Sequence, residues 1–274
     1  MIGDMQKWTP NVAGIIEHAR EIHPKTEIIS RLVSGEIHRS NYEKVCIRSR
    51  KLASALEKDG VKKGDVVATL ALNTYRHLEM YYGISGMGAI THTLNFRLHP
   101  EQAVYIINHA EDKIIFVELP FVPILEALQE NLKTVEKYVV LCEVDEMPET
   151  TLNNAISYEE YIQDGDENYS WPTLEDDAAC ALCYTSGTTG NPKGVLYSHK
   201  SNVIHAQAAL TAMTIKPDDT ILMVVPLFHV LAWGIPYFGP MNGLKLVMPG
   251  MQMEGEPLFE LIDQEDVTLA FGVP

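Results

Sequence analysis

The segment YTSGTTGNPKGV at residues 184–195 concentrates groups that can bind phosphate. Its glycines let backbone N–H groups approach an anion closely, its Ser and Thr hydroxyls can donate hydrogen bonds, and its lysine carries a mobile positive charge. A generic surface loop rarely combines all three features. We therefore predict a phosphate-binding loop whose contacts come from Thr185, Ser186, Gly187, Thr188, Thr189, Gly190 and Lys193.

The spacing within this segment differs from that of a Walker A loop. A Walker A loop has the pattern G-x-x-x-x-G-K-[ST], with a hydroxyl residue directly after the lysine. Here Gly187 and Gly190 are separated by two residues, and Lys193 lies between Pro192 and Gly194. The sequence therefore argues against a P-loop nucleoside triphosphatase.

The elements around the loop must position it. Short apolar segments such as VVATLAL (66–72) and AITHTL (89–94) alternate with helical patterns such as YRHLEMYYGISGMG (75–88). This alternation is typical of an α/β fold with a parallel sheet and helices on its faces. The strand AACALCY (178–184) leads into the loop, and we expect a helix to follow the loop.

Local signals mark several boundaries. A Ser34-Gly35 pair between two short strands predicts a hairpin turn. A helix is expected from about Asn41, with Gly60 as its C-terminal glycine, and Ser198 is a candidate N-cap for a helix over residues 198–213.

We expect two α/β subdomains joined by a surface segment. Residues 1–150 form the first, with an N-terminal arm that could be exchanged in a homodimer. Residues 151–177 are acidic and turn-rich, which is typical of a surface connection. Residues 178–274 form the second, which carries the loop. The chain stops at Pro274 directly after a predicted strand, so we expect the second subdomain to be incomplete.

The composition restricts the function classes. The net charge of −16 disfavours nucleic acid and anionic lipid as partners, although a locally positive pocket could still bind a small anion. There is no run of 18 apolar residues and no signal-peptide pattern, so we expect a cytoplasmic protein without a membrane span. Peripheral membrane contact stays open. Cys180 and Cys183 lie in an apolar strand, which favours a core position over a metal or redox pair.

The twelve-residue loop closely resembles the signature of adenylate-forming (AMP-binding) enzymes. Two further segments are similar to that family: LNFRLHPEQAVYIINHAEDKIIFVE (94–118) and VPLFHVLAWGIPY (225–237). The likeness covers nearly the whole chain and is closest to the N-terminal portion of medium- or long-chain fatty-acyl-CoA synthetases. It implies the stacked α/β subdomains of the large N-terminal domain of these enzymes, here truncated.

The resemblance implies a two-step reaction. A fatty acid reacts with ATP and Mg²⁺ to give acyl-adenylate and pyrophosphate, and coenzyme A then displaces AMP to give the thioester. It also implies roles for particular site residues. The alternative for each of them is an ordinary structural role in the packed interior. Thr185 to Gly190 would hold the β- and γ-phosphates, Thr185 would also bind Mg²⁺, and Lys193 and His229 would be catalytic. His229, Trp233 and Gly234 would bind the carboxylate substrate, with Trp233 able to gate an acyl tunnel.

The substrate class is partly open. The stretch LFHVLAWG (227–234) contains no Asp or Glu, which favours a simple carboxylic acid over an amino acid, because a buried unpaired ammonium is costly. An aryl acid or luciferin-like substrate, or a short form that binds nucleotide without chemistry, remain alternatives.

The resemblance also implies segments that the chain does not contain. These are an aromatic-Gly-x-Thr-Glu segment, an Asp for the ribose, a hinge and a C-terminal domain with a catalytic lysine. We therefore expect that the 274-residue chain alone neither adenylates nor forms thioesters.

Overall fold

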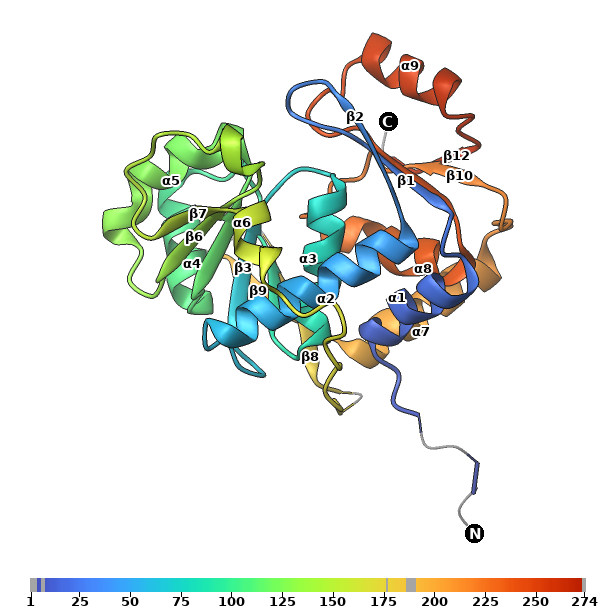
Figure 1. Ribbon diagram of the computed structural model, residues 1–274, viewed down its shortest axis with the longest axis horizontal. Coiled ribbons are helices and arrows are strands. Elements are labelled where there is room, and N and C mark those ends of the chain that lie inside the picture. The colour runs from blue at the N-terminus through green and yellow to red at the C-terminus, as the bar shows by residue number, and fades with distance from the viewer. Residues whose placement is uncertain (1–3, 6–7, 176, 186–190, 273–274) are drawn as a thin grey trace.

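The computed structural model of the protein describes residues 4–5, 8–175, 177–185 and 191–272. Two β-sheets enclose a layer of helices, and further helices cover the outer faces of both sheets (Figure 1). The predicted α/β fold with parallel sheets is confirmed.

The larger sheet carries the strand that leads into the loop. Its seven strands lie in the spatial order β7 (Ala155–Ser157), β6 (Lys137–Val140), β5 (Ile114–Val117), β3 (Val66–Leu70), β4 (Ile90–Thr93), β8 (Ala179–Thr185) and β9 (Lys193–Ser198). All neighbours are parallel except β8 and β9, which form an antiparallel hairpin.

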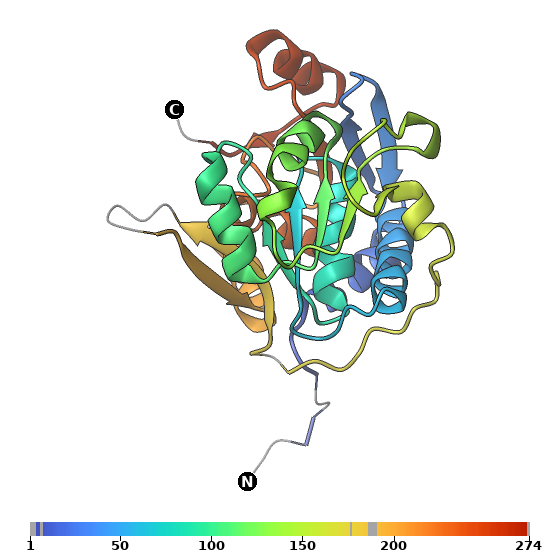
Figure 2. The same cartoon turned by 90° about the vertical axis from the view of Figure 1, so that its left-hand side faces the viewer.

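The hairpin corrects one expectation. The loop is not followed directly by a helix, because β9 lies between it and α7 (His199–Ala212). The sequence KGVLYS is short and begins with residues of the loop pattern, so its strand character was missed. Figure 2 shows this hairpin at the edge of the sheet, beside α4 (Pro100–Ala110).

The smaller sheet has five strands in the order β12 (Leu269–Ala270), β10 (Thr220–Leu222), β11 (Lys245–Met248), β1 (Glu27–Arg31) and β2 (Ile37–Asn41). Its neighbours are parallel except for the β1–β2 hairpin. β1 pairs with β11, and β8 pairs with β4. Each sheet therefore draws strands from both sides of residues 151–177, so a division of the chain at that segment does not coincide with a division between the sheets.

The helices between the sheets share one apolar core with strands of both sheets. They are α1 (Val12–Ile22), α2 (Tyr42–Lys58), α3 (Tyr75–Gly86), α7 and α8 (Ile235–Asn242). Every residue of α3 is buried, including its polar ones. α3 is therefore the centre of the helix layer, where its charged side chains need partners.

Of the remaining helices, α4, α5 (Val122–Leu128) and α9 (Gly255–Gln264) cover outer faces, whereas α6 (Tyr158–Gln163) packs on the same face of the seven-stranded sheet as α2 and α3. α4 and α5 pack on the seven-stranded sheet, α6 lies beside α2, and α9 packs on the five-stranded sheet. Short 3₁₀ turns are η1 (Leu119–Phe121), η2 (Gln129–Asn131), η3 (Val144–Glu146) and η4 (Val230–Gly234).

The predicted boundary signals are confirmed. The β1–β2 turn contains Gly35 with φ 89°, and Gly60 has φ 83° directly after the C-cap of α2. The side chains of Asn41 and Ser198 cap α2 and α7 by accepting backbone N–H groups of the first turns.

The four cysteines are buried free thiols, and Cys180 and Cys183 lie in the core between the sheets as predicted. None of the helices in the described ranges is both long enough and apolar enough to cross a membrane.

One buried amide links the two sheets. Asn73 lies between β3 and α3, and its Nδ2 donates to the carbonyl oxygens of Met223 (2.7 Å) and Val225 (2.9 Å). Its Oδ1 accepts from the backbone N–H of Leu227 at 2.8 Å. These three partners follow β10 of the five-stranded sheet, so the start of α3 fixes the segment that leads to His229.

We predict that Asn73→Ala lowers the free energy of unfolding by about 3 kcal/mol or more, because each buried polar group left unpaired costs about 1–3 kcal/mol. Urea denaturation measures this loss. Asn202→Ala is the matched control, since buried Asn202 has a side-chain bond to a thiol, Cys180 Sγ, rather than three backbone partners. Equal losses for the two variants would contradict the proposed role of Asn73.

Candidate functional site

A cleft of about 310 Å³ opens at the carboxyl ends of β4 and β8. Thr93 ends β4, Asn95 follows it, Thr185 ends β8, and His229 enters from the segment after β10. The carboxyl ends of parallel strands are the usual ligand-binding edge of an α/β sheet. The cleft therefore brings Thr185 and His229 together, as the predicted site requires.

The described ends of the loop face each other. Thr185 pairs in register with Lys193, the first residue of β9, and Thr185 Oγ1 lies 3.5 Å from the Lys193 carbonyl oxygen. Lys193 is exposed, and Pro192 beside it lines the cleft. The predicted phosphate contacts of residues 186–190 (Ser186, Gly187, Thr188, Thr189 and Gly190) lie outside the described residues.

Tyr184, the residue before Thr185, contacts two histidines. Its hydroxyl hydrogen-bonds with His109 Nδ1 on α4 at 2.6 Å, and its ring lies 5.1 Å from the ring of His92. His92 Nδ1 is 2.8 Å from the carboxylate of Asp112, and both side chains are fully buried. Burial raises the pKa of Asp112, against the lowering effect of His92. These contacts orient the residue that precedes the loop.

His229 begins a strained turn. Val230, Leu231, Ala232 and Trp233 all have φ between 47° and 55°, which places four consecutive non-glycine residues in the left-handed region. Each such residue costs about 1–2 kcal/mol. This left-handed turn leads directly into α8 (Ile235–Asn242).

Neighbouring side chains hold the turn in place. Thr93 Oγ1 donates to the Phe228 carbonyl at 3.3 Å, and His205 Nε2 hydrogen-bonds with the Trp233 carbonyl at 3.2 Å. Gly234 has φ 83°, and a Cβ atom there would lie 2.6 Å from His205 Cδ2. Glycine is therefore required at position 234 by both backbone conformation and space.

Trp233 and Gly234 line a second cavity of about 440 Å³. Tyr197 and Val230 line both this cavity and the cleft, so these two side chains form the wall between them. The indole of Trp233 is 38% exposed. The structure thus places His229 at the cleft and Trp233 and Gly234 at the adjoining cavity.

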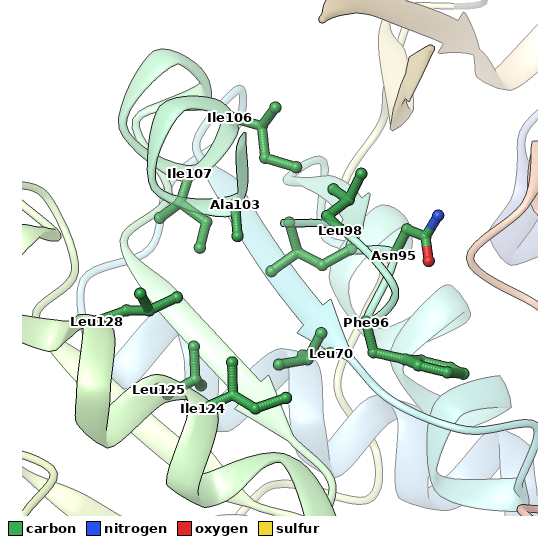
Figure 3. Close-up of a pocket in the computed structure, with 11 residues that line it drawn as sticks. Leu70, Asn95, Phe96, Leu98, Ala103, Ile106, Ile107, Ile124, Leu125 and Leu128 are labelled. Carbon is green, nitrogen blue, oxygen red and sulfur yellow. The ribbon is translucent and has the colours of Figure 1, made fainter. Parts of the chain in front are cut away.

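A third cavity, between β3, α4 and α5, is small and almost wholly apolar (Figure 3). Leu98 and Ile106 line both it and the cleft. Its volume of about 20 Å³ is comparable to a single water molecule. A cavity of this volume has no room for an alkyl chain.

Three polar residues of the cleft were missed by the sequence analysis. Thr93, Asn95 and Gln102 line it, although none belongs to the loop or to the segment around His229. A signal was present, because Thr93 lies near the end of the predicted strand 89–94 and Asn95 directly follows it, at the edge where parallel sheets bind ligands.

The described residues offer little for a metal ion. No group of three His, Cys, Asp or Glu side chains in the part of the chain that the structure describes could hold one. Thr185 supplies a single hydroxyl oxygen at the cleft. The described residues therefore do not form a metal site of their own.

Comparisons with known proteins identify the family. The model of the family described as AMP-binding enzyme matches residues 16–274. The chain is 45% identical to a medium-chain-fatty-acid–CoA ligase of Ectopseudomonas oleovorans, covering all of this chain and 50% of that protein. It is 42% identical to a long-chain-fatty-acid–CoA ligase of Thermus thermophilus, covering 96% of this chain and 48% of that protein. The chain thus spans about half the length of the curated relatives it matches.

A solved structure confirms the fold. The crystal structure of the anthranilate CoA ligase AuaEII in complex with anthranoyl-AMP superposes with a TM-score of 0.87 at 22% identity, covering 99% of this chain and 51% of that one. The family model covers far more than half of the chain. The chain belongs to the AMP-binding enzyme family.

Proposed function

We propose that this chain forms the phosphate- and carboxylate-binding part of an acid–thiol ligase that activates an aliphatic carboxylate with ATP and transfers the acyl group to coenzyme A. The observation that carries the proposal is the cleft, where Thr185 at the start of the glycine-rich loop and His229 lie beside the cavity of Trp233. Relatives named as medium- and long-chain fatty-acid–CoA ligases support a fatty acid as the substrate.

The reaction needs positioning more than covalent help from the protein. A carboxylate oxygen attacks the α-phosphorus of ATP, and pyrophosphate leaves. The sulfur of coenzyme A then attacks the acyl carbon, and AMP leaves. Both steps gain from fixed donors around the charged groups. We assign pyrophosphate stabilisation to Lys193, and contact with the carboxylate and α-phosphate to His229.

The remaining site assignments follow from the same proposal. Residues Thr185 to Gly190 bind the β- and γ-phosphates, and Thr185 Oγ1 would supply one oxygen ligand to the Mg²⁺ that accompanies ATP. The alkyl chain lies in the cavity beside Trp233 and Gly234, because the apolar cavity of Figure 3 is too small. The buried free thiols agree with a cytoplasmic location.

We predict that Lys193→Ala weakens binding of pyrophosphate to the chain by about tenfold, since one charge-assisted hydrogen bond contributes about 1.5–3 kcal/mol and 1.4 kcal/mol is a factor of ten. Isothermal titration calorimetry at fixed low ionic strength measures the dissociation constant for pyrophosphate. Lys216→Ala is the matched control, an exposed lysine in the turn between α7 and β10. If the two variants bind pyrophosphate with equal affinity, Lys193 is not part of the site.

We predict that Trp233→Ala changes how carboxylate affinity depends on chain length. Removing the indole enlarges the cavity, so dodecanoate should gain affinity relative to hexanoate. Dissociation constants for a series of fatty acids from six to twelve carbons measure this. Trp8→Ala is the control, because Trp8 is also partly exposed, at 56%, but packs against α1. If both variants give the same series, the alkyl chain does not bind beside Trp233.

Homodimerisation through the N-terminal arm stays a prediction. Trp8 in the arm and Ile15, Val203 and Met241 of the helix layer line an apolar surface cavity that could receive the arm of a second copy. Light scattering should then give a dimer mass for the chain that falls to the monomer mass when residues 1–10 are deleted. A monomer mass for the intact chain would refute the prediction.

A further inference from the structure

A cavity of about 230 Å³ lies on the same edge of the seven-stranded sheet as the cleft, but at other strands. It opens between the tip of the β1–β2 hairpin and the carboxyl ends of β3, β5 and β6. Its walls include Leu32, Val33, Thr74, Arg76, Glu118 and Leu141. The cleft at Thr185 and His229 is lined by different residues, and the proposed function does not use this cavity.

Thr74 lines this cavity and has a buried hydroxyl without a hydrogen-bond partner among the described residues. It is the N-cap of α3, a helix of 12 residues, but its side chain makes no capping hydrogen bond. Thr74 is 3% exposed, and its Oγ1 has no hydrogen-bond partner among the residues that the structure describes. Buried hydroxyls nearly always have a partner, so this one indicates a missing ligand or water.

Glu118 is the second polar group of the cavity. It follows β5, is 4% exposed, and its Oε2 accepts the backbone N–H of Leu72 at 3.3 Å. Burial raises the pKa of Glu118 to about 7, against the lowering effects of Leu72 N–H and Arg76. At neutral pH and below, the protonated carboxyl group is therefore a hydrogen-bond donor.

The other charged groups around Glu118 already have partners. The guanidinium of Arg76, on α3, donates to Glu159, to Glu143 and to the Leu141 carbonyl. Glu146 on η3 lines the cavity and accepts the Glu143 backbone N–H, and the neutral thiol of Cys142 lies after β6. The cavity thus retains the hydroxyl of Thr74 and the protonated carboxyl group of Glu118 as unused O–H donors beside the positive end of the α3 dipole.

We propose that this cavity binds a small aliphatic carboxylate, which accepts hydrogen bonds from Thr74 Oγ1 and from the Glu118 carboxyl group and packs its alkyl chain against Leu32, Val33 and Leu141. The donors and the helix N-terminus favour an anionic acceptor, and the apolar walls favour an alkyl group. The site is a second carboxylate site, separate from the cleft of the proposed reaction.

The test uses hexanoate as the probe on the 274-residue chain, with calorimetry at pH 6 and pH 8. An anion binds the protonated form of Glu118, so affinity falls as pH rises through the pKa of about 7. The protonated fractions of Glu118 at the two pH values predict about tenfold tighter binding at pH 6. Thr74→Val should weaken binding at pH 6 by about three- to tenfold.

The variant Glu118→Gln distinguishes a cavity that binds a carboxylate from one that binds a cation. The amide is a donor at every pH, so this variant should bind hexanoate at pH 8 as well as at pH 6. If Glu118→Gln instead abolishes the binding of hexanoate, Glu118 does not act as a donor and the proposal is wrong. The proposal is also wrong if hexylamine binds at pH 8 and hexanoate binds at neither pH, because the cavity then binds a cation.

The location of binding is checked separately. Amide NMR signals of Leu72, Thr74 and Leu119 should shift on addition of hexanoate. If only signals around Thr185 and His229 shift, or if His229→Ala removes the pH dependence, the observed binding belongs to the cleft and the proposal fails. Both cavity variants preserve side-chain shape, and Thr74→Val removes an unpaired hydroxyl, so its thermal midpoint should be unchanged or raised.

Discussion

The junction between β3 and α3 holds the two sheets in register, and the ligand-binding edge depends on it. Asn73 fixes the segment after β10 through three buried hydrogen bonds, and the next turn adds a contact from the Tyr75 N–H to Ser30 Oγ on β1. Because α3 is buried on all sides, its N-terminus cannot move without disturbing both sheets. The cleft at β4 and β8 and the cavity at Thr74 are therefore positioned by the same junction.

The rigid packing of α3 also stabilises the left-handed turn that follows His229. Four non-glycine residues with positive φ cost about 4–8 kcal/mol together. The turn persists because both of its ends are fixed. The Tyr81 and Tyr82 hydroxyls on α3 donate to the carbonyls of Leu227 and Pro236, before and after the strained residues. Strain of this kind occurs at functional sites, where surrounding packing fixes a side chain that relaxed backbone would not present.

Local sequence signals predicted the turns and helix caps, because their conformations depend on interactions between residues that are close in the sequence. Gly35, Asn41 and Ser198 mark a turn and two caps, because each conformation is set within a few residues. The signature loop and the segment around His229 were found by resemblance. The pairing of Ile28 with Leu246 joins distant strands, and no local periodicity encodes it. The left-handed turn and the contacts of Asn73 and Thr74 arise from tertiary packing, so only the structure reveals them.

The net charge of −16 and the proposed anionic ligands are compatible for a physical reason. Much of the buried charge is paired internally, as in the contacts of Arg48 with Glu79 and of Arg76 with Glu159. Exposed charges are screened within about 10 Å at 0.1 M ionic strength, so the acidic surface repels long anionic polymers more than small anions. At the two proposed binding sites we assign ligand recognition to short-range donors: Lys193 at the hairpin, and Thr74 with the N-terminus of α3 at the cavity. The sign of the net charge therefore limits which partners the protein binds, while the chemistry of each pocket determines its ligand.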